Sequence, residues 1–254
     1  MDRFIHTALN ALGNLRGVQT VSAQNLANQN VPGFRRDFIA EGAAFVLEGA
    51  DGAPSPRAFQ MDREEAGFSD LSGFLDKTGE PLDIAIAGAG YFYIRPDTGG
   101  PPALSRRGDL QIGLDGALVN GAGEAVLSQG LQPIVLPPHR NIVIDELGRI
   151  TIEPLDGAPG ERLEVAMIGT TLAQGLALAK GEDGQIRPQT GPLPAPDQAA
   201  KVAQGVLEGS NVNPTEELIA SIDLQRSFEL NMRVISAAKE IDEAGAQLLR
   251  APDA

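Results

Sequence analysis

The chain has 254 residues, of which 42% are hydrophobic and 21% charged, a balance that indicates a globular protein with a buried core and excludes a disordered one. The formal net charge of −14 argues against a nucleic-acid binder, which needs clustered Lys and Arg to neutralise phosphates. The absence of cysteine excludes disulfides and thiolate metal sites.

The sequence gives no sign of membrane insertion or of a cleaved leader. No apolar run is long enough to span a bilayer. The N-terminus, Met1 to His6, lacks the basic region and apolar stretch of a secretory signal. If the protein leaves the cytoplasm, we expect it to use a route that leaves the N-terminus uncleaved.

The first segment has the periodicity of a helix of about 26 residues. Its apolar stripe recurs at three- and four-residue spacing and comprises Ile5, Ala8, Leu12, Leu15 and Leu26. The pattern ends where Pro32 biases Val31 away from helix and Gly33 permits a turn.

The middle of the chain predicts extended chain and then strands. Residues 35–80 have no clean period and are interpreted as an extended connecting segment. From Pro81 apolar and small residues alternate, and Gly88-Ala89-Gly90 predicts a hairpin between 82–87 and 91–94. A second hairpin is predicted over 142–152, with its turn at Asp145–Gly148. Since no helical segment separates these strands, the sheet should be antiparallel.

The last segment predicts a long helix that begins at an Asn213 cap, with Pro214 at its first position and Glu216 three residues after the cap. A strict heptad seam follows, formed by Leu230, Val234, Ala237, Ile241, Ala244 and Leu248. A further apolar patch on another side is formed by Leu224, Phe228, Ile235 and Ala238. This helix therefore has more apolar surface than one partner could cover.

These pieces predict an α+β fold in which amphipathic N- and C-terminal helices pair as a coiled-coil core and a central antiparallel β-rich domain lies between them in sequence. The expected divisions are residues 1–34 for the first helix, 35–80 for the connecting segment, 81–200 for the β-rich domain and 201–254 for the last helix. We expect the helix pair to pack against other subunits.

Catalysis is not expected, and neither is a bound metal or cofactor. The chain has two histidines, His6 and His139, and neither has a partner at metal-ligand spacing. Gly88-Ala89-Gly90 lacks the third glycine and the following helix of a dinucleotide site. The acidic cluster of Asp62, Glu64 and Glu65 is better explained as a solvated face than as an acid–base pair.

Five segments, in order along the chain, resemble the flagellar rod and hook family. Near the N-terminus, Asn-Leu-Ala-Asn at 25–28 precedes Gly-Phe-Arg at 33–35, and 82–92 is similar to the family's central segment. Residues 105–108 with 116–119, 205–213 and 225–229 resemble its later segments. The matching motif positions are Asn25, Leu26, Asn28, Gly33, Phe34, Asn211, Asn213, Gln225 and Arg226.

The resemblance implies a structural subunit that polymerises into a helical tube crossing the periplasm, transmits torque and encloses the export channel. It implies copies of the chain and other rod subunits as partners, and type III export without a cleaved signal. It also places the terminal helices in the inner core of the tube and the β-rich domain outside. The expected subunit-interface residues are Ile5, Leu12, Leu15, Leu26, Leu230, Val234, Ile241 and Leu248.

Alternatives remain at this stage. Within the family, the opening Met1-Asp2-Arg3 and the ending 237–249 favour the proximal rod, while a distal rod subunit is the alternative. Pro32 stands where the family usually has a hydroxyl residue, and Phe228 where the distal rod usually has Tyr. A soluble β-rich binding module and an enzyme with a site at Asp62, Glu64 and Glu65 are the other readings, and neither explains the apolar surface of the last helix.

Overall fold

The computed structural model describes the backbone of a large part of the chain and the side chains of somewhat fewer residues. The described backbone comprises residues 2–39, 44–48, 54–60, 66–158, 160–181 and 183–249. The side chains of Ile5 and Leu248, two of the predicted interface residues, lie outside the described set, as does the acidic cluster of Asp62, Glu64 and Glu65.

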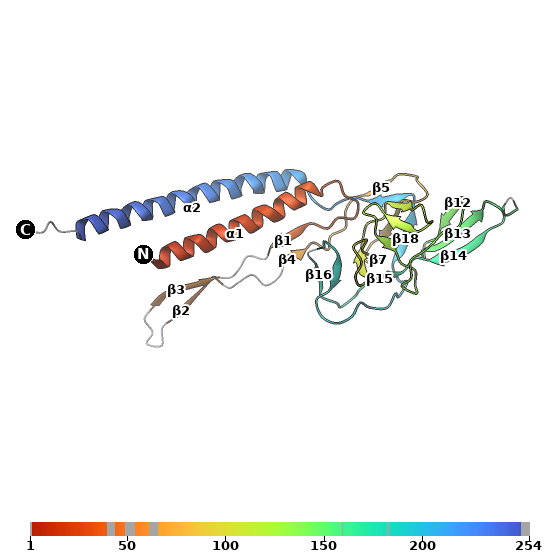
Figure 1. Ribbon diagram of the computed structural model, residues 1–254, viewed down its shortest axis with the longest axis horizontal. Helices are drawn as coiled ribbons and strands as arrows, with labels where there is room; N and C mark the ends of the chain where they lie inside the picture. The colour runs from red at the N-terminus through yellow and green to blue at the C-terminus, as the bar shows by residue number, and fades with distance from the viewer. Residues whose placement is uncertain are drawn as a thin grey trace, which may run out of the picture. The chain divides into compact units, whose positions relative to one another are not determined.

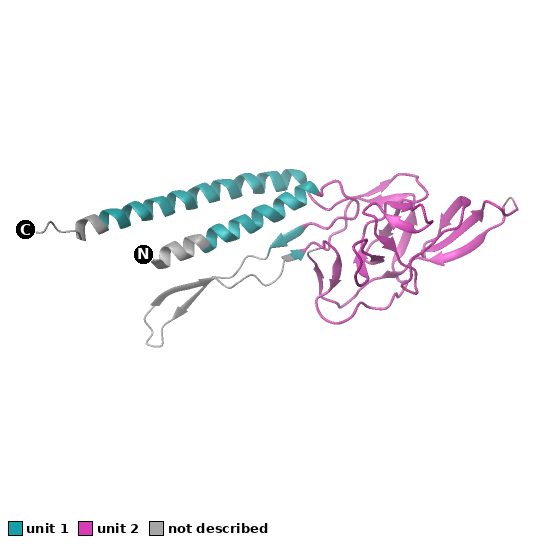
Figure 2. Ribbon diagram, in the orientation of Figure 1, with its two compact units in different colours: residues 1–27, 37–67, 213–254 teal, residues 28–36, 68–212 magenta. Residues whose placement is uncertain are grey.

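The chain divides into two compact units, which are coloured separately in Figure 2. Unit 1 consists of Met1–Ala27, Asp37–Gly67 and Asn213–Ala254. Unit 2 consists of Asn28–Arg36 and Phe68–Val212. Each unit is therefore assembled from segments that are distant in sequence.

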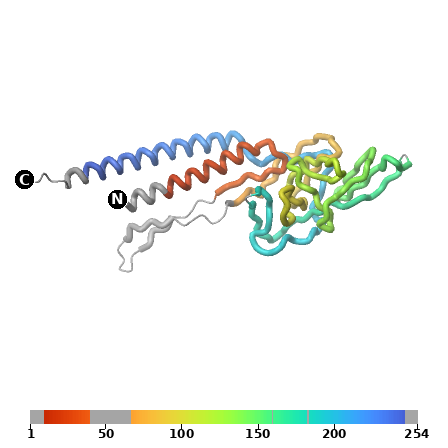
Figure 3. Tube along the Cα trace, in the orientation of Figure 1, coloured from red at the N-terminus to blue at the C-terminus, as the bar shows by residue number. Residues whose placement is uncertain are grey.

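Unit 1 is built on two helices, α1 (Asp2–Ala27) and α2 (Pro214–Leu249), which contact each other (Figure 3). The predicted terminal helices and their pairing are thereby confirmed, and with them the α+β class. The strands that lie wholly or partly in this unit are β1 (Asp37–Ile39), which pairs with β4 (Ala66–Phe68), and β2 (Ala44–Glu48), which pairs with β3 (Pro54–Gln60).

Helix α2 begins at the predicted cap. The Asn213 side-chain oxygen accepts hydrogen bonds from the backbone N–H groups of Thr215 at 3.1 Å and Glu216 at 3.5 Å. The Asn213 amide donates in turn to the Glu216 carboxylate at 2.9 Å. Because the first N–H groups of a helix have no partner within it, this cap satisfies donors that would otherwise need water.

Unit 2 consists of short antiparallel strands (Figure 1). Its main sheet has the order β16-β17-β8-β7-β11-β10-β9, with β15 beside β7, and β12-β13-β14 form a second sheet. Two ribbons, β18–β6 and β19–β5, complete it. The bounds are β5 Leu75–Lys77, β6 Ile84–Ala87, β7 Tyr91–Arg95, β8 Ala103–Ser105, β9 Leu110–Ile112, β10 Leu118–Asn120, β11 Ala125–Val126, β12 His139–Ile144, β13 Arg149–Pro154, β14 Leu163–Met167, β15 Thr170–Thr171, β16 Leu178–Lys180, β17 Ile186–Pro188, β18 Lys201–Gln204 and β19 Val206–Glu208.

One predicted hairpin is confirmed and the other is wrong. Strands β12 and β13 pair as expected, with Ile144 opposite Ile150. Strand β6, however, pairs with β18, and β7 with β8, β11 and β15. Gly88-Ala89-Gly90 therefore leads the chain from one sheet into another. Alternation in a sequence identifies strands but does not say which strand each will pair with.

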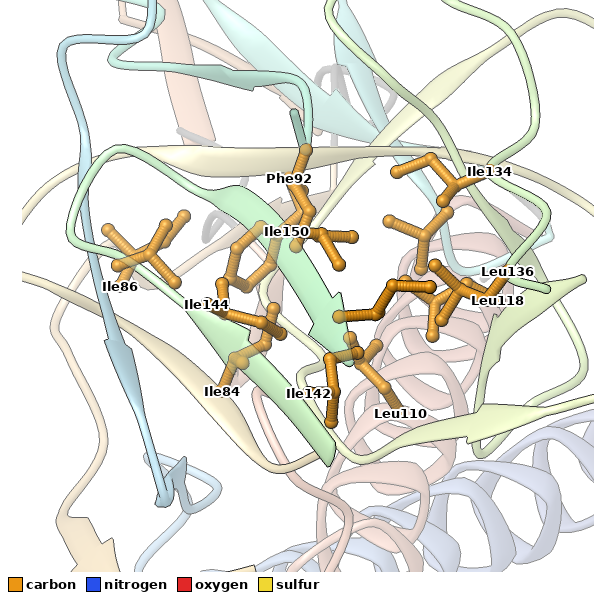
Figure 4. Close-up of a cluster of buried hydrophobic side chains, with 14 of the residues drawn as sticks. Ile84, Ile86, Phe92, Leu110, Leu118, Ile134, Leu136, Ile142, Ile144 and Ile150 are labelled. Atoms are coloured by element: carbon orange, nitrogen blue, oxygen red, sulfur yellow. The ribbon is translucent and has the colours of Figure 1, made fainter. Parts of the chain in front are cut away.

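The principal core of unit 2 lies where several of these strands meet (Figure 4). Alternate residues of β12 and β13 point into it, and Phe92 of β7 packs among them. Burial of each such side chain contributes about 1.5–3 kcal/mol. The residues labelled in the figure are Ile84, Ile86, Phe92, Leu110, Leu118, Ile134, Leu136, Ile142, Ile144 and Ile150.

Candidate assembly interface

Helix α2 has two apolar stripes with different surroundings. The patch of Leu224, Phe228, Ile235 and Ala238 is half-buried, and it lies on the side that α1 covers. The described residues of the heptad seam, Leu230 to Ala244, are exposed in the single chain, with Leu230 at 61% and Ile241 at 62% of full exposure. A helix turns about 100° per residue, so the two stripes lie on different sides. Helix α1 therefore leaves the seam uncovered.

Three of the predicted interface residues of α1 are described, and they have intermediate burial. Leu12, Leu15 and Leu26 are half-buried in unit 1. Val234 of α2 belongs with Leu230 and Ile241 on the exposed seam. The packing of these side chains against other subunits stays a prediction.

A buried polar cluster joins α1 to the first turn of α2. Glu217 is 2% exposed, and its carboxylate accepts hydrogen bonds from Ser22 at 2.7 Å and from the Asn25 amide at 3.1 Å. The Asn25 amide also donates to the backbone carbonyl of Asp37 at 2.8 Å, while its oxygen accepts the Asp37 N–H at 2.9 Å. Because buried polar groups must be paired, this cluster specifies one register of α1, α2 and β1.

We expect Asn25→Ala to destabilise unit 1 by about 1–3 kcal/mol, because it removes three hydrogen bonds from a buried site. Urea unfolding of the purified chain, followed by far-UV circular dichroism, measures this change. Gln19→Ala is the matched control, since Gln19 is exposed on the same helix. Equal midpoints for the two variants would show that the cluster does not hold the helices together.

The motif glycine Gly33 lies where two chain segments of unit 2 approach closely. Its φ is +67°, and a Cβ at this position would lie 2.3 Å from the backbone carbonyl of Arg106. Its N–H donates to the backbone carbonyl of Glu208 at 2.7 Å. Only glycine suits this position, since both the backbone conformation and the contact exclude a side chain. At the next residue, Phe34, the Lys180 ammonium lies over the aromatic ring, 4.0 Å from the ring centroid.

Asn211 ties three segments of unit 2 together. Its N–H donates to the carbonyl of Phe34 at 3.2 Å, and its side-chain oxygen accepts the Arg36 N–H at 2.6 Å. Its amide donates to the carbonyls of Ser69 at 3.2 Å and Leu71 at 2.7 Å. Each of the three segments continues along the chain into unit 1. Asn211 therefore holds the places where the chain leaves unit 2.

A buried ionic cluster, which we call the Glu208 cluster, lies at the same place and consists of Arg35, Arg106 and Glu208. The Glu208 carboxylate lies 2.6 Å from one Arg106 nitrogen and 3.1 Å from an Arg35 nitrogen. Arg106 also donates to the carbonyls of Gly90 at 2.7 Å and Ile86 at 3.1 Å. Burial lowers the pKa of the Arg106 guanidinium, and the Glu208 carboxylate opposes that shift. Burial, and to a smaller extent the Asp70 carboxylate, raises the pKa of the Tyr91 side chain to about 12.

Not every motif residue lies with the Glu208 cluster in unit 2. Asn28 is half-buried and lines the same hollow as Gly33, Phe34 and Arg35. Leu26 is half-buried on α1, while Gln225 and Arg226 are exposed on α2. Arg226 lies 4.0 Å from Asp223, one turn away on the same helix.

Sequence reasoning missed Ser22, Glu217 and the three members of the Glu208 cluster as site residues. The available signal was a charged residue in a strand pattern, such as Glu208 after Val206 and Leu207, because charges are rarely buried unless paired.

The described residues offer little chemistry beyond packing and ionic contacts. Among them, no group of three or more His, Asp or Glu side chains could hold a metal ion. His139 lies 2.9 Å from the carbonyl of Pro137, and the side chain of His6 lies outside the described set. None of the described helices is both long enough and apolar enough to cross a membrane.

Comparison with known proteins shows what class of protein this is. Residues 203–248 match the family described as flagellar basal body rod FlgEFG protein C-terminal, and residues 85–152 match the flagellar hook protein FlgE/F/G D1 domain. These are structural proteins of the flagellum and not enzymes.

The chain belongs to the flagellar basal-body rod FlgE/F/G family. It is 31% identical to the flagellar basal-body rod protein FlgF of Salmonella typhimurium, over 98% of this chain and 99% of that protein. It is 30% identical to FlgF of Caulobacter vibrioides, over 98% of both chains. Identity to the rod protein FlgG of Bacillus subtilis is 26%, over 95% of this chain and 97% of that protein. It is a FlgF-like rod protein.

Proposed function

We propose that the chain polymerises as a subunit of the proximal rod, in a helical tube that crosses the periplasm, transmits torque and encloses the export channel. The observation that carries the proposal is the heptad seam of α2, which α1 leaves exposed although its spacing is that of a packed coiled coil. A head-to-tail contact whose rotation does not close generates a tube of this kind.

In this assembly, the terminal helices of the expected core segments 1–34 and 201–254 form the inner core, and the expected β-rich domain 81–200 faces outward, with 35–80 connecting them. Residues 201–208 go with the β-rich domain, because they form β18 and β19 of unit 2. The core contacts are made by Ile5, Leu12, Leu15, Leu26, Leu230, Val234, Ile241 and Leu248. The partners are copies of the chain, other rod subunits and the type III export apparatus, which passes the chain outward without cleaving a signal.

Deletion of the gene in the source bacterium tests the proposal. We expect non-motile cells whose purified basal bodies lack a complete rod, and recovery of both properties when the gene is restored. Electron microscopy of the basal bodies, with antibody detection of the chain, measures the outcome. Cells that swim normally without the gene, or basal bodies that never contain the chain, would contradict it.

A distal rod subunit is the second candidate, because the chain is also similar along most of its length to FlgG proteins. The same micrographs separate the two positions. A rod that stops close to the cytoplasmic membrane in the deletion strain supports the proximal assignment, whereas a rod that lacks only its outer part supports the distal one.

A further inference from the structure

Residues 28–36, which we call the strap, belong to unit 2 but are separated from the rest of it in the sequence (Figure 2). They join the end of α1 to the start of β1, whereas the remainder of unit 2 is one continuous stretch, Phe68–Val212. Among the described residues, both hydrophobic cores of unit 2 are formed by that stretch, and neither contains a residue of the strap. Unit 2 can therefore form its cores before the strap docks.

Hydrogen bonds hold the strap to the rest of unit 2. Its backbone bonds to Glu208 and Asn211 at 2.6–3.2 Å, and Lys180 donates to the Arg35 carbonyl at 2.7 Å. Each such bond contributes little net free energy, because water takes its place when the strap leaves. Docking also orders the whole strap, which costs conformational entropy. The closed strap is therefore a balance of opposing terms, as in segments that open locally.

The strap is incompletely packed and incompletely bonded. It lines a hollow of about 260 Å³, together with Leu104 of β8 and Ile186 of β17. The Arg35 side chain is only 4% exposed, yet its Nε has no hydrogen-bond partner among the described residues. An unpaired buried donor costs free energy, and opening recovers that cost because water then solvates the group.

Opening the strap leaves no buried charge unpaired in the Glu208 cluster. Arg106 keeps its bonds to the Glu208 carboxylate, at 2.8 Å from Nε and 2.6 Å from a second nitrogen. Arg35, the third member of the cluster, leaves with the strap and is solvated. Breaking a buried ion pair is costly chiefly when it strands a charge, so this arrangement lets the strap open without unfolding unit 2.

We propose that the strap opens and closes on a unit 2 that is already folded, and that only the closed strap is competent for assembly. The second part rests on the proposed rod function. In the closed strap Arg36 is bound to Asn211, and the next residue, Asp37, is bound to Asn25 of α1. Opening removes the first of these anchors, so the helices that make the proposed rod contacts lose a fixed point of attachment.

Native-state proteolysis measures the opening, because the strap contains its own trypsin site. Arg35 is 4% exposed in the closed strap, so cutting after it requires opening. Arg106, which is 2% exposed in the same cluster, is the internal control, since it becomes accessible only when unit 2 unfolds. With a low dose of trypsin on the purified full chain, mass spectrometry should show the cut after Arg35 well before any cut after Arg106.

Gly33→Ala should speed the cut after Arg35 by about tenfold or more, because a strained φ and a close contact both oppose the closed form. Its Cβ would lie 2.3 Å from the Arg106 carbonyl. Gly79→Ala is the matched control, since Gly79 also has a positive φ, of +76°, but a Cβ there meets nothing within 4 Å. Phe34→Ala is a milder second variant and should act in the same direction. In cells, the Gly33→Ala chain should be made and exported but missing from basal bodies.

Equal rates of cutting after Arg35 and Arg106 would overturn the inference, because the strap would then unfold only with unit 2. So would a Gly33→Ala rate equal to that of Gly79→Ala. Normal rods built from rapidly cut Gly33→Ala chain would overturn the part concerning assembly and leave the rod function standing. If the natural chain is missing from the basal bodies of swimming cells, the rod function itself fails, while the proteolysis still decides whether the strap opens.

Discussion

Replacing Glu208 with alanine is expected to destabilise unit 2 by about 3–5 kcal/mol, because it leaves two buried guanidinium groups without their carboxylate. Arg35, Arg106 and Glu208 are each less than 5% exposed, so water cannot take the place of the lost partner. The backbone N–H of Gly73 loses its acceptor as well. Domains are typically stable by about 5–15 kcal/mol, and the loss is therefore a large share of the total.

Urea unfolding followed by tyrosine fluorescence measures this effect in unit 2 alone. The chain has no tryptophan, and its two tyrosines, Tyr91 and Tyr93, both lie in unit 2. Glu164→Ala is the matched control, since the ion pair of Glu164 with Arg149 is exposed and such pairs contribute about 0–1 kcal/mol. A Glu208→Ala midpoint equal to that of Glu164→Ala would show that the Glu208 cluster does not stabilise the fold.

Ile241→Asp is expected to leave the single chain folded and exported, yet to prevent rod assembly and motility. Ile241 is 62% exposed in the chain, so a polar residue there costs the monomer little. In the proposed tube the side chain is buried, which contributes about 1.5–3 kcal/mol. An unpaired charge at the same place costs more again, and the fault recurs at every interface of that type.

Swimming assays and electron microscopy of basal bodies measure this outcome, and circular dichroism of the purified variant checks its folding. Glu240→Gln is the control, because Glu240 immediately precedes Ile241 in α2 and is also exposed. Normal rods with Ile241→Asp would refute the seam as an assembly surface. Equal damage from both changes would show that the faces of α2 are assigned wrongly.

The amino-acid sequence alone determined those helices and hairpins whose formation depends only on neighbouring residues. The period of α1, the Asn213 cap of α2 and the hairpin of β12 and β13 all depend on residues close together in the chain. Each was predictable because helix caps and tight turns are satisfied by neighbours a few residues away. The antiparallel character of the β-rich domain followed from the lack of helices between its strands.

Tertiary structure alone decided which surfaces meet. The sequence contains two apolar stripes on α2, but only the packing shows that α1 covers Phe228 and leaves Ile241 open. In the same way β6 pairs with β18, more than a hundred residues away, instead of with β7. Glu208 likewise joins Arg35 and Arg106, which are also more than a hundred residues away in the sequence. Periodicity in the sequence shows that one face of an element is apolar, and a lone charge among apolar residues shows that it needs a partner. Neither pattern identifies the partner, because the partner depends on how distant segments of the chain pack.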